Sequence, residues 1–102
     1  MITCFIKYTL DPFRLADFED YARRWLTIIP RCGGGLIGYW MPKEGTNNIA
    51  TALIEFESLA AYEQYRTRLK ADPEGAGNFA SAQETRCILV EERTFLQKVE
   101  AR

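Results

Sequence analysis

Apolar residues follow two different spacings along this chain, and the order of those spacings limits the folds that it can adopt. Four segments are predicted to be strands: residues 2–10 and 49–56, where apolar positions alternate as in half-buried strands, and residues 36–41 and 85–96. Apolar residues three and four positions apart predict two helices, one over residues 12–29 and one between Ser58 and Asp72. The predicted order β-α-β-β-α-β is the ferredoxin-like α+β arrangement, in which two helices cover one face of a four-stranded antiparallel sheet.

Residues at the predicted boundaries support these assignments. Asp11, which precedes a proline, is typical of a helix N-cap, and Ser58 is predicted to cap the second helix. Pro30 is expected to end the first helix, and the Asp-Pro pair at Asp72 is expected to end the second. Only a short helical turn around Phe79 is expected between that point and the last strand.

The size and composition are those of one soluble domain spanning residues 1–102, since 47% of the residues are apolar and 26% are charged. The formal net charge of −1 offers no basic face to neutralise a run of phosphates, so nucleic-acid binding is not expected. The third strand also lacks the basic residues of an RNA-recognition strand. The chain has no histidine, which excludes His-based acid–base chemistry, His-ligated zinc and a proximal-His haem.

The three cysteines, Cys4, Cys32 and Cys87, are far apart and include no CxxC pair. Neither a disulfide framework nor a metal site is predicted, because both need closer and more numerous cysteines. Free thiols in a reducing cytoplasm are the expected state. The N-terminus has no leader-like run and the apolar segments are too short for a membrane span, so we expect a cytoplasmic protein.

Residues 33–38, GGGLIG, match the string G-x-G-x-x-G of dinucleotide-binding proteins. That motif requires a strand before the glycines and a helix after them, so that a phosphate meets the N-terminus of the helix. The predicted order here is reversed, which favours a helix stop followed by a flexible entry into the next strand. No bound cofactor is predicted.

One face of the predicted sheet has nothing in the chain to cover it. Apolar side chains are predicted on that face at Phe5, Leu53, Leu89 and Phe95. An exposed apolar sheet face usually marks an interface. We therefore expect a homodimer whose two sheets pack face to face into a barrel, with the long last strand reaching across.

Aromatic side chains are predicted to gather between the sheet and the helices. Tyr8 lies on the helix-facing side of the first strand, and Trp25 and Tyr65 lie on the inward stripes of the two helices. These side chains form either a pocket for a flat organic ligand or simply a core of large residues. Arg86, expected on the inward face of the last strand, is either ion-paired with a glutamate or binds an anionic ligand.

Four stretches, spread in order over roughly residues 5–90, resemble the NIPSNAP family: YTLDP at 8–12, GGLIGYW at 34–40, FESLAAYE at 56–63 and ADPE at 71–74. The resemblance implies the dimeric α/β-barrel fold and a relationship to cofactor-free antibiotic-biosynthesis monooxygenases. It implies no settled reaction for bacterial members.

Two departures from the family pattern limit which residues can be carried over. Residues 4–6, CFI, replace the Glu-Leu-Arg stretch of the family, and the histidine of the related monooxygenases and haem-degrading barrels is absent. The carry-over is therefore limited to Tyr8, Trp40 and Arg86.

Two functions stay open at this stage. The slightly favoured hypothesis is a non-catalytic binding or scaffold homodimer that holds a small hydrophobic ligand. The alternative is a cofactor-free monooxygenase- or cyclase-like enzyme acting on a small aromatic or polyketide-like molecule, with Tyr8 as an acid or hydrogen-bond donor and Arg86 stabilising negative charge. The candidate ligand-binding residues are the same in both: Tyr8, Trp25, Trp40, Tyr65 and Arg86.

Overall fold

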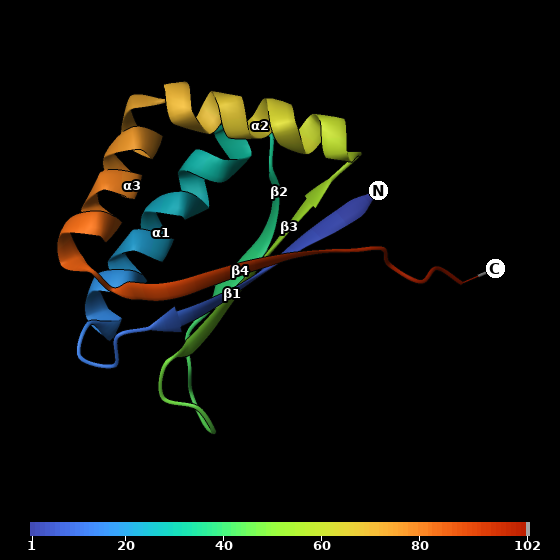
Figure 1. Ribbon diagram of the computed structural model, residues 1–102. Helices are drawn as coiled ribbons and strands as arrows, with labels where there is room; N and C mark the ends of the chain where they lie inside the picture. The colour runs from blue at the N-terminus through green and yellow to red at the C-terminus, as the bar shows by residue number, and fades with distance from the viewer. Residues whose placement is uncertain (102) are drawn as a thin grey trace.

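The computed structural model describes residues 1–101 and confirms an α+β fold built on a four-stranded antiparallel sheet (Figure 1). The elements follow in the order β1 (Ile2–Leu10), α1 (Leu15–Arg31), β2 (Gly35–Trp40), β3 (Ile49–Phe56), α2 (Leu59–Ala71), α3 (Pro73–Thr85) and β4 (Ile88–Leu96). In space the strands lie in the order β2-β3-β1-β4, so β2 and β4 form the edges.

All three helices lie on one face of the sheet, and no helix of the described residues covers the other face (Figure 1). The core lies between the two layers. On β1 and β3 alternate side chains are buried against the helices, as the period-2 pattern predicts. Along α1 the buried stripe consists of Phe18, Tyr21, Ala22, Trp25, Ile28 and Ile29. No helix within residues 1–101 is long and apolar enough to cross a lipid bilayer.

A third helix, α3, stands where the sequence predicted only a short helical turn. The Asp72 carboxylate accepts hydrogen bonds from the backbone N–H groups of Glu74 and Gly75, at 3.0 and 3.1 Å, and so caps the start of α3. Pro73 lies in the first turn, where its missing N–H removes no helical bond. Two glycines lower the helix propensity of this segment, but the cap and the packing against α1 keep it helical.

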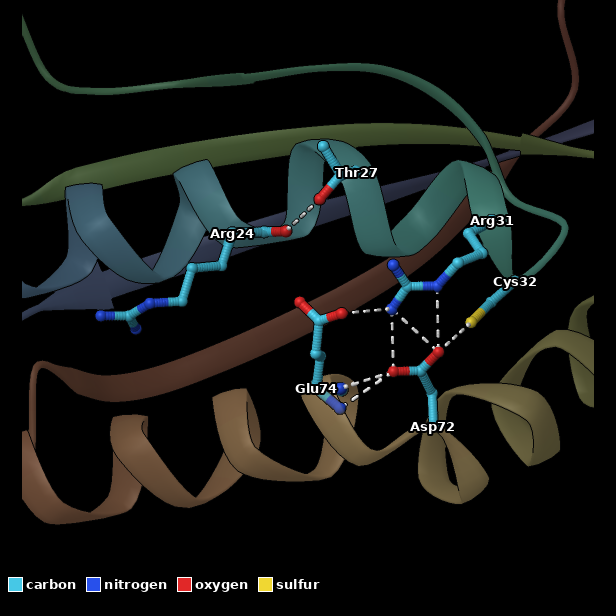
Figure 2. A network of polar contacts seen from close by, with 7 residues as sticks. Arg24, Thr27, Arg31, Cys32, Asp72 and Glu74 are labelled. Carbon is cyan, nitrogen blue, oxygen red and sulfur yellow. Dashed lines mark hydrogen bonds and ion pairs between the residues drawn. The ribbon is translucent and has the colours of Figure 1, made fainter.

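Asp72 also joins the helices to one another (Figure 2). Arg31, in the last turn of α1, donates to both carboxylate oxygens of Asp72, with Nη2–Oδ1 at 2.9 Å and Nε–Oδ2 at 3.1 Å. The backbone hydrogen bond from Gly75 is the main cause that holds the pKa of Asp72 below its usual value, and the Arg31 guanidinium adds to it. The Cys32 thiol lies 3.8 Å from Oδ2 of the same carboxylate.

The start and end of α1 differ from the prediction. Asp11 folds a turn instead of capping the helix, because its Oδ1 accepts from the Phe13 N–H and its carbonyl accepts from the Arg14 N–H, both at 2.9 Å. Pro30 lies inside the last turn, where a proline removes a single helical hydrogen bond. Gly33, with φ at 101°, then turns the chain toward β2.

A β-bulge at Leu89 changes the direction of the side chains along β4. Thr9 pairs with Val90 and Leu10 with Ile88, which leaves Leu89 as an extra residue. Because side chains alternate with a period of two, the extra residue reverses the alternation beyond it.

The prediction that Phe95 lies on the uncovered face is therefore wrong. Phe95 pairs with the buried Cys4 and faces the helices, with its ring centroid 4.9 Å from that of Tyr62. Leu89, also predicted on the uncovered face, lies at the bulge and is 59% exposed.

A second bulge, at Ile37, does the same to β2. Leu36 pairs with Ile54, but the next pair in the register joins Gly38 and Leu53. Beyond the bulge, Tyr39 pairs with the buried Ala52 and faces the helices. Trp40 pairs with Thr51 and lies on the uncovered face, where it is 48% exposed.

Candidate functional site

Three of the five candidate residues meet in the interior. Tyr8, Trp25 and Tyr65 are at most 2% exposed and line one small interior cavity between the sheet and the helices. That cavity has a volume of about 10 Å³, enough for about one water molecule. Neighbouring aromatic rings occupy the space around it, such as Phe79, whose ring centroid lies 4.9 Å from that of Trp25. These side chains are packed as a core in this conformation.

The cluster also contains Tyr39, whereas the candidate residue Trp40 lies on the opposite face of the sheet. The hydroxyl oxygens of Tyr8 and Tyr39 lie 3.3 Å apart and share a hydrogen bond. Burial is the main cause that raises the pKa of both phenols well above its usual value. Both hydroxyls therefore stay protonated at neutral pH. Tyr8 is held by a partner inside the core and does not point into an open site.

An ion pair that sequence analysis missed lies on β4 beside this cluster. Arg93 donates to Oε2 of Glu91 from Nε at 3.0 Å and from Nη2 at 2.6 Å, and its Nη1 donates to the Tyr62 hydroxyl at 3.1 Å. Burial is the largest single effect and lowers the pKa of Arg93, but the charge and hydrogen bond of Glu91 together with the nearby Tyr62 and Tyr8 outweigh it, and the pKa is raised overall. The two residues share the helix-facing side of β4 because both lie beyond the bulge.

The sequence suggested that Arg86 lies on the inward face of the last strand, but in the structure it does not. Because α3 continues to Thr85, Arg86 lies before β4 as the C-cap of that helix. Its backbone is in the left-handed region, with φ at 56° and ψ at 34°, and its side chain is exposed. Glu91, a glutamate that lines the same cleft as Arg86, is paired with Arg93.

An open cleft of about 550 Å³ runs along the edge strand β4. Its walls come from α1, α3, the junction after α3 and the start of β4: Tyr21, Phe79, Ala82, Gln83, Arg86, Ile88, Leu89 and Glu91. Aromatic and aliphatic side chains make most of this lining, and one guanidinium, one amide and one carboxylate supply polar groups. Burial raises the pKa of Tyr21 to about 12, so its phenol is neutral and able to donate a hydrogen bond.

Asn78 fixes the two helical walls of this cleft relative to each other. It is 2% exposed, and its side-chain amide donates to the backbone carbonyl of Tyr21 at 3.0 Å. Its Oδ1 accepts from Arg24 Nη1 at 3.1 Å. A buried, satisfied polar bridge of this kind holds α3 on α1 in one register. Within residues 1–101 no group of three or more Cys, Asp or Glu side chains is arranged to hold a metal ion.

The strand order, with helices on one face of the sheet, defines a ferredoxin-like α+β protein, and its cleft lies at the β4 edge. The model of the NIPSNAP family matches residues 3–101. The chain belongs to the NIPSNAP family. No curated protein matches it in sequence.

Several solved structures share the fold. Protein Atu4242 from Agrobacterium tumefaciens is 22% identical with a TM-score of 0.85, over 97% of this chain and 94% of that one. An uncharacterized NIPSNAP domain protein from Burkholderia xenovorans is 19% identical with a TM-score of 0.79, over 97% and 95% of the two chains. A putative antibiotic biosynthesis monooxygenase from Nitrosomonas europaea is 6% identical with a TM-score of 0.75, over 98% and 100%. At these identities the likeness shows the fold alone.

Proposed function

We propose that this protein is a homodimeric binding protein that holds a small planar organic ligand in the cleft along β4. The observation that carries the proposal is the cleft of about 550 Å³, a volume within the usual range for small-molecule sites. The interior cavity is far smaller, at about 10 Å³. Tyr21 and Phe79 offer aromatic surface to a flat ligand, and Arg86 and Gln83 offer donors at the same site.

The uncovered face of the sheet supports the homodimer. Phe5 and Leu53 pair with each other on that face and are half-buried, and Trp40 and Val90 expose apolar surface beside them. A net charge of −1 opposes self-association only weakly. We infer a cytoplasmic location from the three free, buried cysteines, which suit a reducing compartment.

The test of the binding role is native mass spectrometry of the protein purified from its own host. We expect a dimer that carries an additional mass of a few hundred daltons, which is the size of a ligand that fits the cleft. Ala82→Phe fills the cleft and removes that mass, whereas Ala80→Phe, on an exposed position of the same helix, retains it. A wild-type dimer without bound mass contradicts the binding role.

A second candidate function, proton abstraction from a bound substrate, is favoured by the position of Glu91. Both hydrogen bonds from Arg93 go to Oε2, and no side chain within residues 1–101 donates to Oε1 of this cleft-lining carboxylate. A carboxylate of this kind acts as a general base when an acidic C–H or O–H lies within hydrogen-bond reach. The fold likeness to a putative antibiotic biosynthesis monooxygenase is compatible with such chemistry.

The enzyme role has its own test. The ligand released from the host protein is returned to the enzyme in heavy water, and its deuterium content is followed by mass spectrometry. Wild-type protein then exchanges an acidic C–H of the ligand, and Glu91→Gln does not. Equal exchange with and without protein contradicts the enzyme role and leaves the binding role intact.

A further inference from the structure

The inference below rests on the proposed cleft ligand and specifies its chemistry. We propose that the ligand is a planar organic acid, and that Arg66 of α2 binds its carboxylate behind the Phe79 ring. Arg66 plays no part in the structural ion pairs described above.

The first support is an unsatisfied group on Arg66. Its Nη1 atom is buried and has no hydrogen-bond partner within residues 1–101. A buried donor without an acceptor costs free energy, more so when it carries charge, so native structures seldom leave one unpaired. An acceptor brought by a ligand removes that cost.

The second support is the balance of charge around the interior cavity. Arg66 and Arg93 both line the cavity, and Glu91 neutralises Arg93. Two positive charges and one negative charge leave a net charge of +1, because none of the salt bridges within residues 1–101 includes Arg66. Burial raises the pKa of the Cys4 thiol, and the charges of Arg93 and then Arg66 partly oppose that rise. A monoanion balances this charge.

The third support is the wall that separates Arg66 from the open cleft. Tyr21 and Phe79 line both the cleft and the interior cavity, so these two rings divide one space from the other. The Arg66 guanidinium carbon lies 5.9 Å from the centroid of the Phe79 ring, within the range of a cation–π contact. Rotation of the Phe79 side chain joins the two spaces and opens Arg66 to a ligand in the cleft.

These features together define the ligand. Its ring system lies in the cleft against Tyr21, where aromatic surface favours stacking. Its acid group passes Phe79 and accepts a hydrogen bond from Arg66 Nη1, whose planar guanidinium suits a carboxylate. The interior cavity of about 10 Å³ holds little more than one water molecule, so the acid enters only when Phe79 moves.

The test compares 2-naphthoate with 2-naphthamide, which have the same shape and differ in charge, by isothermal titration calorimetry. A charged hydrogen bond to Arg66 makes wild-type protein prefer the acid by about tenfold or more. Arg66→Met removes that preference. The control Arg68→Met, at an exposed position of the same helix that lines neither the cleft nor the interior cavity, retains it, and Arg86→Met tests whether the cleft-lining Arg86 binds the acid instead.

A second measurement does not depend on how well the Arg66→Met variant folds. In the wild-type protein, naphthoate shifts the side-chain NMR signal of Arg66 and naphthamide does not. Equal binding of both probes, or loss of the preference in Arg86→Met alone, overturns the role of Arg66 and leaves the cleft as a binding site. Failure of both probes to bind contradicts the proposed cleft ligand, and the present inference with it.

Discussion

At the scale of single residues, the ion pair at the edge of the core is formed by Arg93 and not by Arg86, the arginine that the sequence indicated. Arg93 and Glu91 are each only about a quarter exposed, at 25% and 29%, and the Tyr62 hydroxyl accepts a third hydrogen bond. By comparison, Arg23 and Glu19 form an ion pair on the surface of α1, at 62% and 50% exposure. The two pairs give a direct comparison of partly buried and exposed charge in one molecule.

Removing one partner of the inner pair is expected to destabilise the protein. Glu91→Gln leaves the Arg93 charge without its counterion and lowers the free energy of unfolding by about 2 kcal/mol. The double variant, with both Glu91→Gln and Arg93→Met, loses less stability than the sum of the two single variants. Urea unfolding of the four proteins measures the coupling. The matching cycle on Glu19 and Arg23 gives a coupling of about 0.5 kcal/mol or less. Equal couplings at the two sites contradict the structural role of the inner pair.

The buried phenols make the protein sensitive to alkaline pH. The native pKa of Tyr21 is about 12 and the unfolded value is 10.0, so the native state binds the proton more tightly. The resulting stability is fully present below about pH 10 and is lost as the pH rises from there toward the native pKa. Over that interval we expect Tyr21 to contribute a decline of roughly 1.4 kcal/mol per pH unit.

Tyr21→Phe removes that contribution. The measurement is the free energy of unfolding, determined by chemical unfolding at about pH 9, 10 and 11. We expect it to fall less steeply with pH in the variant than in the wild type. Lysine and cysteine titrations affect both proteins alike and cancel in the comparison. Parallel declines show that Tyr21 does not carry the effect.

At the scale of elements, the helix layer depends on how closely α2 and α3 join at Asp72. The cap on α3 and the link to Arg31 both use this one carboxylate. Gly75, in the first turn of α3, packs against the end of α2, where an added Cβ would lie 2.6 Å from the carbonyl oxygen of Leu69. The same sequence feature, a glycine near the start of a helix, has no such neighbour at Gly77.

Gly75→Ala and Gly77→Ala are therefore expected to have opposite effects on thermal stability. Gly75→Ala forces the α2–α3 junction apart and costs on the order of 1–3 kcal/mol. Gly77→Ala meets no heavy atom within 4 Å and gains about 0.5–1 kcal/mol from the better helix propensity of alanine. Thermal unfolding of the two variants decides the matter. A loss of stability of the same size in both variants contradicts the close contact at the junction.

The strands show which part of an element can be predicted from the sequence. The alternation over residues 2–10 predicts the inward face of β1 correctly, because β1 pairs without a shift along most of its length. Both edge strands contain one extra residue, at Ile37 and at Leu89. Neither bulge has a clear signal in composition, since each is a property of the pairing between two strands. This explains why Phe95 lies on the face opposite to the one expected, and why Tyr39 and not Trp40 faces the helices.

At the scale of the whole molecule, the two faces of the sheet differ in what they contact. The helices cover one face (Figure 1). The strand register places Phe5, Leu53 and Trp40 on the other. Burial of this face against a second copy is the proposed dimer. The helical layer stays on the outside of such an assembly, which leaves the helix surfaces in contact with solvent.

Sedimentation velocity tests this arrangement. The wild type is expected as a dimer, and Leu53→Glu as a folded monomer, because a carboxylate at the centre of the face is desolvated in the dimer. Leu59→Glu, at a 57% exposed position of α2, serves as the control and remains dimeric. A monomeric wild type contradicts a sheet-to-sheet interface. So does a dimer that persists in Leu53→Glu but dissociates in Leu59→Glu.

The sequence alone predicted the order of the strands and of α1 and α2, the inward stripe of α1 and the burial of Tyr8, Trp25 and Tyr65, but it missed α3. These follow from periodicity within one segment, which depends on neighbours a few residues away. Only the folded structure shows that Arg86 is exposed while Arg93 faces the helices, and that the interior cavity is small while the cleft at the β4 edge is large. Those features depend on strand register and helix packing between residues far apart in the chain, where one extra residue reverses a face.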